Sequence, residues 1–205
     1  MNISEGILSG PVLLSGAALA AAGTAMGLKK LDYDHIAKTG ILAAAFFVAS
    51  LIHVPLGPAN AHLILNGLVG LLLGWAAFPA ILVALVLQAV FFQYGGITTL
   101  GVNTIIMALP AVLCYLLFGP LIYKGPRVAS GAAFSCGAAS VLFSGILVGL
   151  ALVFTEKNFL EVSGLVVAAH IPVMIIEGIV TVVCVAFLKK VQPEMLMNYH
   201  GQRRL

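Results

Sequence analysis

In this 205-residue, largely apolar chain, nitrogen-bearing groups able to bind a metal ion occur at the N-terminus and in the segment from His53 to His62. His53 and His62 flank an uncharged connection bent by Pro and Gly. We expect Met1 to be retained before the bulky Asn2, which gives a free α-amine followed by a backbone amide that can close a five-membered chelate ring. Nitrogen ligands of this kind suit divalent nickel, copper and cobalt. The spacing alone also fits histidines that only form hydrogen bonds at the membrane interface.

A second polar pair, His170 and Glu177, lies within an apolar stretch near the C-terminal end. Residues seven apart share one face of a helix. A carboxylate deep in a membrane is expensive, and by default it indicates a functional site. The alternative is a structural pair, or a hydrogen bond that fixes one span against another, since a single acid makes a poor proton relay.

The composition excludes a water-soluble domain. Hydrophobic residues make up 61% of the chain and charged residues 8%, whereas soluble domains carry about 25% charged residues. Lipid must therefore be part of the solvent, in one compact membrane domain. The net charge of +3 without a basic run gives no footprint for nucleic-acid binding.

Several enzyme and metal-site motifs are absent from the sequence. The cysteines lie apart in apolar stretches and form no C-x-x-C pair, which favours buried hydrophobes over a thiolate site or a disulfide: Cys114, Cys136 and Cys184. There is no phosphate-binding G-x-x-x-x-G-K-[ST] loop, no H-E-x-x-H and no G-x-S-x-G. We therefore expect no enzyme, and any ATP-driven motor must be another chain.

The apolar stretches predict an all-α integral membrane protein. A spanning helix needs about 20 apolar residues. Residues 1–191 then form a transmembrane domain, and 192–205 form a basic cytoplasmic tail. The predicted spans are Ile7–Leu28, Thr39–Val54, Asn60–Phe78, Pro79–Gln93, Thr98–Tyr123, Arg127–Phe154 and Val162–Leu188.

Charge placement sets the expected orientation, with the N-terminus outside and the C-terminus cytoplasmic. With seven spans that alternate in direction, Lys157 is the only Lys or Arg expected at an outer end of a span. The inner ends carry Lys29, Lys30, Lys38, Lys124, Arg127, Lys189, Lys190, Arg203 and Arg204. This asymmetry follows the positive-inside rule, and an even number of spans would break it.

Four segments together resemble one family. They are the start M-x-I-x-E-G-x-L-S, the turn V-P-x-G-P-x-x-x-H-L ending at Leu63, the stretch Gln88–Asn103, and the stretch from His170 to Gly178. They look like the CbiM/NikM family, the substrate-capturing membrane subunits of energy-coupling-factor importers of cobalt and nickel. The resemblance runs from Met1 to about Lys190.

The resemblance implies a seven-helix subunit whose N-terminus tucks into the bundle. The transported nickel or cobalt ion would be bound by the Met1 amine, by the backbone nitrogen and side chain of residue two, and by His62. Loop residues would cover and shape this site: Tyr94, Gly95, Gly96 and Asn103. No prosthetic group is implied.

The resemblance also implies partners and a location. The family works with a separate transmembrane coupling subunit and two ATP-hydrolysing subunits, and often with a small extra membrane subunit. We therefore expect a multi-pass protein of a bacterial-type inner membrane.

Residue two departs from the family pattern, because the family usually has histidine there and this chain has Asn2. A carboxamide is a much poorer donor than imidazole for nickel or cobalt. His53 is a candidate replacement on the basis of its position.

Three other functions remain open at this point. A subunit that captures an organic micronutrient needs an aromatic pocket, and the sole tryptophan, Trp75, is expected at the cytoplasmic end. An intramembrane enzyme would have only His170 and Glu177 to work with. A self-contained metal permease would need more intramembrane charge than this chain has.

Overall fold

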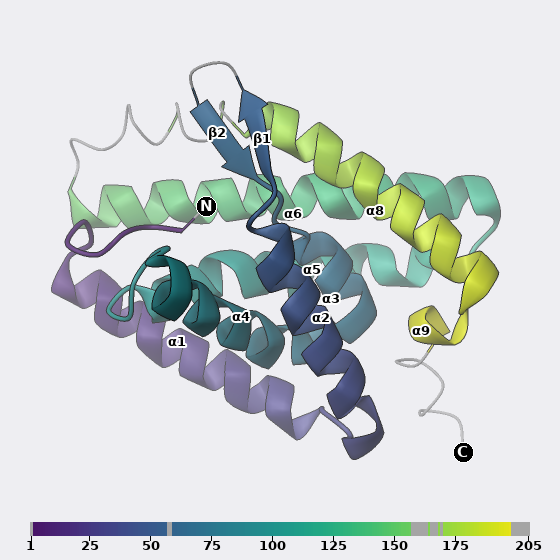
Figure 1. The fold of residues 1–205 in the computed structure, drawn as a ribbon, viewed down its shortest axis with the longest axis horizontal. Coiled ribbons are helices and arrows are strands. Elements are labelled where there is room, and N and C mark those ends of the chain that lie inside the picture. The colour runs from purple at the N-terminus through teal and green to yellow at the C-terminus, as the bar shows by residue number, and fades with distance from the viewer. Residues whose placement is uncertain (1, 57–58, 157–163, 165–167, 169, 198–205) are drawn as a thin grey trace.

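The computed structural model describes residues 2–56, 59–156, 164, 168 and 170–197, without the side chains of residues 53–62. The described part is a helical bundle with one two-stranded hairpin (Figure 1). Its long elements are α1 (Gly10–Lys29), α2 (Ile36–Ala49), α4 (Ala77–Phe92), α5 (Leu100–Ile122), α6 (Pro126–Thr155) and α8 (Ile171–Val191). Its short elements are η1 (Tyr33–His35), β1 (His53–Leu56), β2 (Ala59–His62), α3 (Asn66–Leu73), η2 (Gly74–Ala76) and α9 (Glu194–Met197).

Local sequence signals explain where several helices begin and end. Proline occupies the first turn of α1, α6 and α8, where its missing N–H costs nothing. Lysines in the last turns of α1 and α8 complement the partial negative charge of the helix C-terminus.

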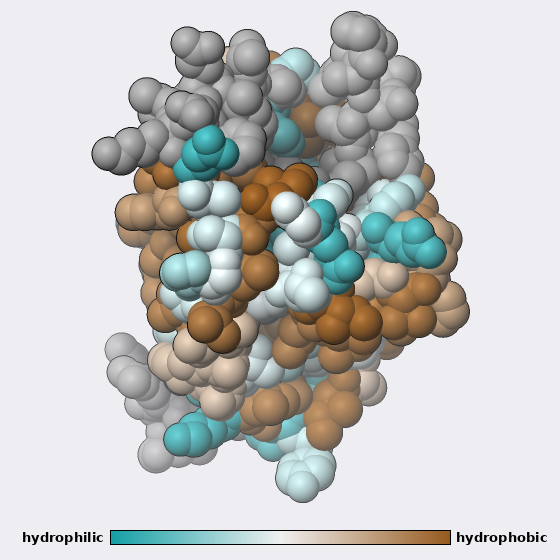
Figure 2. Space-filling view, turned by 90° about the vertical axis from the view of Figure 1, so that its left-hand side faces the viewer, coloured by the Kyte–Doolittle hydropathy of each residue, from teal (hydrophilic) through white to brown (hydrophobic). Residues whose placement is uncertain are grey.

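The described helices suit a multi-pass membrane protein. Five helical runs are long and apolar enough to cross a membrane, and Asn66–Phe92, which includes α3 and α4, counts among them as one run. The 14-residue α2 is shorter than these runs. Large apolar side chains are exposed along most helices, and Figure 2 shows brown apolar surface over much of one face.

The run Asn66–Phe92 consists of two helices, α3 and α4, which run in opposite directions within the bundle. Asn66 lies beside Met107 and Gly74 beside Tyr115, so α3 runs alongside α5 in the same direction. Pro79 then lies beside Gly27, near the end of α1, and α4 returns from there. Gly74 makes the reversal with φ 55°, a backbone region open to glycine. With α3 and α4 counted separately, α1, α2, α3, α4, α5, α6 and α8 give seven helices of eight or more residues in the described part.

The predicted third span, Asn60–Phe78, was wrong at both ends. Asn60 lies in β2, and α3 ends at Leu73, before the reversal. The sequence did not reveal the strand pairing of the hairpin or the Gly74 turn, because neither segment contains an Asp, Glu, Lys or Arg that would mark a break between spans. The predicted second span, Thr39–Val54, was also wrong at its end, because α2 ends at Ala49 and Val54 lies in β1. The other helix boundaries lie close to the predicted spans, except that Val162, the predicted start of the last span, lies outside the described residues.

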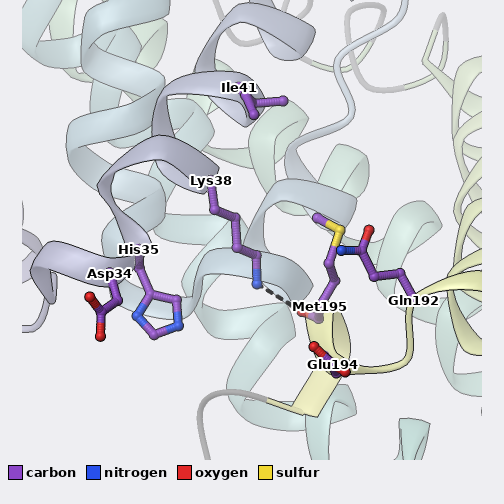
Figure 3. A pocket seen from close by; sticks show the side chains of 7 residues that line it. All are labelled: Asp34, His35, Lys38, Ile41, Gln192, Glu194 and Met195. Atoms are coloured by element: carbon purple, nitrogen blue, oxygen red, sulfur yellow. Dashed lines mark hydrogen bonds between the residues drawn. The ribbon is translucent and has the colours of Figure 1, made fainter.

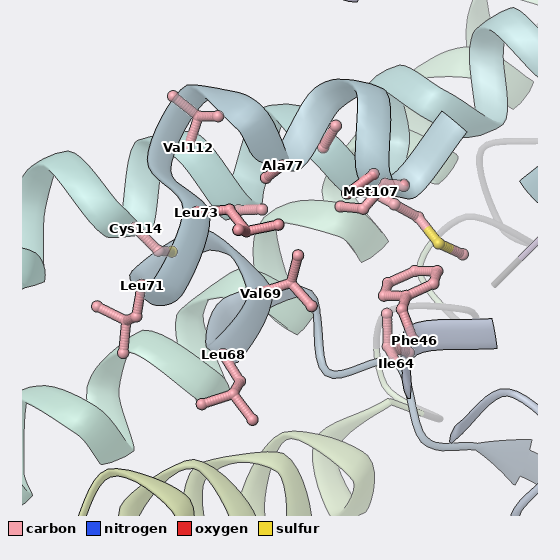
Figure 4. Close-up of a cluster of buried hydrophobic side chains, with 14 of the residues drawn as sticks. Phe46, Ile64, Leu68, Val69, Leu71, Leu73, Ala77, Met107, Val112 and Cys114 are labelled. Carbon is pink, nitrogen blue, oxygen red and sulfur yellow. The ribbon is translucent and has the colours of Figure 1, made fainter. Parts of the chain in front are cut away.

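The core lies where α3, α4 and α5 meet (Figure 4). Phe46, Ile64 and Met107 lie close together in it, each with 2% or less of its surface exposed. Glycine allows the backbones to come into contact, since a Cβ at Gly70 would overlap the carbonyl of Ala111. Close approach of small residues is how helices associate in lipid.

The predicted tail, residues 192–205, contains the short helix α9, which packs against the end of the bundle near Lys38 and Tyr123. Lys38 donates to the carbonyl of Met195 at 2.7 Å (Figure 3). Tyr123 donates to the carbonyl of Leu196, whose side chain is buried. Residues 198–205 lie outside the described part. We call this end of the bundle, with Lys29, Lys30, Lys124, Arg127, Lys189 and Lys190, the basic end.

Candidate functional site

The N-terminal segment, residues 2–9, lies against the helices at the end opposite the basic end. It has no regular secondary structure before α1, and Gly6 turns it with φ 79°. The side chains of Ile3 and Leu8 are buried in the core. Burial of two large apolar side chains, at roughly 1.5–3 kcal/mol each, stabilises the docked segment.

Asn103, in the first turn of α5, binds the backbone of Ile3 in both directions. Its Oδ1 accepts from the Ile3 N–H at 2.9 Å, and its Nδ2 donates to the Ile3 carbonyl at 3.0 Å. Nδ2 also donates to Thr99 Oγ1 at 3.2 Å. The Asn103 side chain is buried, so these bonds replace the water that Ile3 would otherwise bind.

Asn2 reaches α4. Its Nδ2 donates to Gln88 Oε1 at 2.9 Å, although Gln88 is 1% exposed within an apolar helix. Asn2 Oδ1 and Gln88 Nε2 are buried and have no hydrogen-bond partner among the described residues. Unsatisfied buried polar atoms are rare in folded proteins, and a bound ion or water is a common partner for them. The Met1 end of the segment, which would supply the amine, lies outside the described residues.

The loop from Gln93 to Thr99 covers Glu5. Glu5 Oε1 accepts from the Thr98 N–H at 3.0 Å and from Thr98 Oγ1 at 3.2 Å. The Glu5 N–H donates to the Gly95 carbonyl at 3.2 Å. The backbone hydrogen bond from Thr98 is the largest cause that lowers the pKa of the Glu5 carboxyl below its usual value.

The glycines of this loop allow its close approach to the N-terminal segment. Gly95 and Gly96 have φ of 79° and 141°. A Cβ at Gly95 would lie 2.7 Å from Asn103 Nδ2 and 3.4 Å from Asn2 Cβ, while one at Gly96 would overlap the Glu5 side chain. Tyr94, directly before Gly95, belongs to the same loop, and its N–H donates to the Gln88 carbonyl at 3.3 Å.

The hairpin places the two predicted histidine positions opposite each other. In the antiparallel β1–β2 register His53 pairs with His62. Residues paired in this way have Cα atoms about 4.5–5.5 Å apart. The hydrogen bond from the Leu63 N–H to the Ile52 carbonyl, 3.1 Å long, extends the pairing toward the bundle. The side chains of both histidines lie outside the described part.

Glu177 on α8 fixes the chain directly after this hairpin. Its carboxylate accepts from the Ile64 N–H, and both of its oxygens accept from the Leu65 N–H at 3.0 Å. These N–H groups precede the first turn of α3, where partial positive charge favours an anion. The side chain of Glu177 is fully buried, and Leu65 has φ 55°, so the carboxylate holds a strained turn in place.

Asn66 adds a second anchor to the same turn. Its Nδ2 donates to Ser144 Oγ at 2.9 Å and to the Met107 carbonyl at 3.3 Å. The start of α3 is therefore bound to α5, α6 and α8 at once. His170 lies at the N-cap of α8, about two helical turns from Glu177.

The structure brings together Asn2, Tyr94, Gly95 and Asn103, with Gly96 against Glu5. Sequence reasoning assigned no role to Gln88, Thr98 or Asn66. Gln88 could have been found as a polar residue amid the apolar residues of α4, by the same argument that drew attention to Glu177. No three His, Cys, Asp or Glu side chains form a metal-binding group in the described part, which includes neither Met1 nor the two hairpin side chains.

Comparison with known proteins gives one consistent result. The family described as "Cobalt uptake substrate-specific transmembrane region" matches residues 2–195. A Haemophilus influenzae protein, provisionally named a metal transport protein, is 44% identical over 201 residues, which cover 96% of this chain and 97% of that protein. The cobalt transport protein CbiM of Clostridium tetani is 28% identical over all of this chain and 90% of its own length.

The fold has also been seen in solved structures. A transition metal transporter matches with a TM-score of 0.74 and 27% identity over the full length of both chains. A truncated transition metal transporter matches with a TM-score of 0.71 and 26% identity, over 92% of this chain and 98% of that one.

Proposed function

The chain belongs to the CbiM family, and from this membership we propose that it is the substrate-specificity subunit of an energy-coupling-factor transporter that imports nickel or cobalt ions. The observation that carries the proposal is the docked N-terminal segment. Asn103 binds Ile3 and Thr98 binds Glu5, so Asn2 is held against Gln88. Asn2 Oδ1 and Gln88 Nε2 are buried there without partners among the described residues.

The proposed ligands are nitrogen atoms from two parts of the chain. The Met1 amine and the backbone nitrogen of Asn2 would form a chelate ring, and His62 would add an imidazole from the hairpin. Nitrogen-rich coordination is well suited to Ni²⁺ and Co²⁺. The anchor that Glu177 provides at Ile64 and Leu65 supports this assignment, because it fixes the chain just after His62.

Asn2 changes the ligand set from the family pattern, and we assign the fourth nitrogen to His53. The Asn2 carboxamide already donates to Gln88, and its oxygen is a poor ligand for these ions. His53 lies directly opposite His62 in the antiparallel pair of strands, so the backbone places a second histidine beside the first.

This chain would carry no catalytic step, and partner subunits would hydrolyse ATP. The proposed partners are a transmembrane coupling subunit and two ATP-binding subunits, with a small extra membrane subunit in some assemblies. The basic end would face the cytoplasm of a bacterial-type inner membrane, as the positive-inside rule requires, and the hairpin would face outward.

Uptake of nickel and cobalt into proteoliposomes tests the proposal. The chain with its coupling and ATPase partners should import metal only when ATP is present on the side of the ATPases. Uptake by the chain alone would instead indicate a self-contained permease. If the complete complex bound and imported neither metal, an organic micronutrient would become the better substrate.

A further inference from the structure

A groove opens between α6 and α8 at the basic end. In the middle of the bundle these helices touch, since a Cβ at Gly137 would lie 2.6 Å from the Glu177 carbonyl oxygen. Toward the basic end they leave a cavity of about 290 Å³ between them. Its lining includes Ala129, Val182, Ala186, Lys189 and Lys190.

The walls of the groove are apolar and continue into the outer surface of α8. Ala129, Val182 and Ala186 form its sides. Next to them, Val183 and Phe187 are each 61% exposed. Exposed apolar side chains of this kind suit contact with lipid tails. The groove is therefore open to the apolar layer and accessible from the side.

The end of the groove is positive. Lys189 and Lys190 line it, and neither ammonium group has an ion-pair partner within the described residues. The first turn of α6 lies beside them, and it contains no acidic residue and no side-chain cap. The partial positive charge of this helix start adds to the two lysines. None of the lining residues is acidic.

We propose that this groove binds one anionic phospholipid. The headgroup phosphate lies between Lys189, Lys190 and the start of α6, and an acyl chain lies along Val182 and Ala186. An apolar groove that ends in two lysines, with no acidic residue in its lining, matches a molecule with one anionic and one apolar part. Basic pockets between transmembrane helices recognise anionic headgroups in this way. The inference is independent of the metal site, which lies at the other end of the bundle.

Native mass spectrometry of the full chain, with phosphatidylglycerol and phosphatidylcholine offered in competition, tests the inference. The two lysines supply the attraction for the anionic headgroup, so K189Q/K190Q should weaken phosphatidylglycerol binding roughly 30-fold. Ala186→Trp should also weaken it by filling the groove. The control K29Q/K124Q removes equal charge from exposed positions at the same end and should leave this binding unchanged.

Three results would overturn the inference. An equal loss in K29Q/K124Q would mean diffuse attraction to the basic end. A loss in K189Q/K190Q without one in Ala186→Trp would mean that no acyl chain enters the groove. Unchanged binding in both groove variants, with helical circular dichroism intact, would leave the groove to another kind of partner. Inorganic phosphate added as a competitor should not displace the lipid, because it has no apolar part.

Discussion

The side chain of Asn103 accepts a hydrogen bond from the Ile3 N–H at 2.9 Å and donates one to the Ile3 carbonyl at 3.0 Å. One carboxamide therefore serves the donor and the acceptor of a residue that lies 100 positions away in sequence. A carboxamide carries its donor and its acceptor on two atoms of one planar group, which lets it serve both backbone groups of one residue. This contact ties the N-terminal segment to α5 and places Asn2 beside Gln88.

Asn103→Leu should therefore release the N-terminal segment. The variant keeps the branched shape and the number of non-hydrogen atoms but leaves two buried groups of Ile3 unpaired, at about 1–3 kcal/mol each. We expect metal affinity, measured by calorimetry, to fall at least about tenfold. Thr104→Val is the matched control, because that buried hydroxyl only bonds back to Leu100 within α5. Equal affinities in the two variants would contradict a role for docking.

Gly96→Ala should disrupt the loop that covers Glu5. The added Cβ would overlap the Glu5 side chain, and a φ of 141° is strained for alanine. Glu5 would have to move away and lose its bonds to Thr98, so we expect faster proteolysis near the N-terminus and weaker metal binding. Gly131→Ala should have neither effect, since nothing lies within 4 Å of its Cβ. Identical proteolysis of the two variants would show that the loop adapts.

Glu177→Gln should destabilise the turn that follows the hairpin. The carboxamide keeps one acceptor but directs an NH₂ group at the N–H groups of Ile64 and Leu65. Hydrogen bonds to a charged group contribute about 1.5–3 kcal/mol each, so we expect a loss of about 2–3 kcal/mol and reduced metal affinity. Thr181→Val, a buried change one turn along α8, controls for simple repacking. Normal metal affinity in Glu177→Gln would exclude positioning of His62 by this carboxylate.

The docked segment should loosen in acid. The pKa of Glu5 is lowered in the folded chain, chiefly by the Thr98 backbone N–H. Its contribution to stability is therefore complete above the usual glutamate pKa of about 4.3, and it is lost as the pH falls through the lowered folded value. Thermal unfolding below about pH 4 should show this loss in the wild type, and the corresponding decline should be smaller in Glu5→Gln. An equal decline of thermal stability with falling pH in the wild type and in Glu5→Gln would contradict this role of Glu5.

The sequence alone predicted the class of fold and several residues that meet at the N-terminal segment. Composition and the positions of lysines and prolines determine where an apolar chain turns, and these signals identified most helix boundaries. The strand pairing around Asn60 and the reversal at Gly74 were not predicted, because neither segment contains an Asp, Glu, Lys or Arg. The partners of Asn103 and Glu177 could not be predicted either. These side chains bind backbone groups of Ile3, Ile64 and Leu65, and backbone groups carry no signal in the sequence.

Calorimetric titration of Ni²⁺ and Co²⁺ into the purified chain, beside Asn2→His, His62→Gln and His53→Gln, tests the central claim most directly. We predict metal binding by the wild type, tighter binding by Asn2→His, and none by His62→Gln. His53→Gln should weaken binding in the Asn2 background and matter less once His is restored at position two. Absence of binding in both the wild type and Asn2→His, or full binding by His62→Gln, would contradict the proposed metal site.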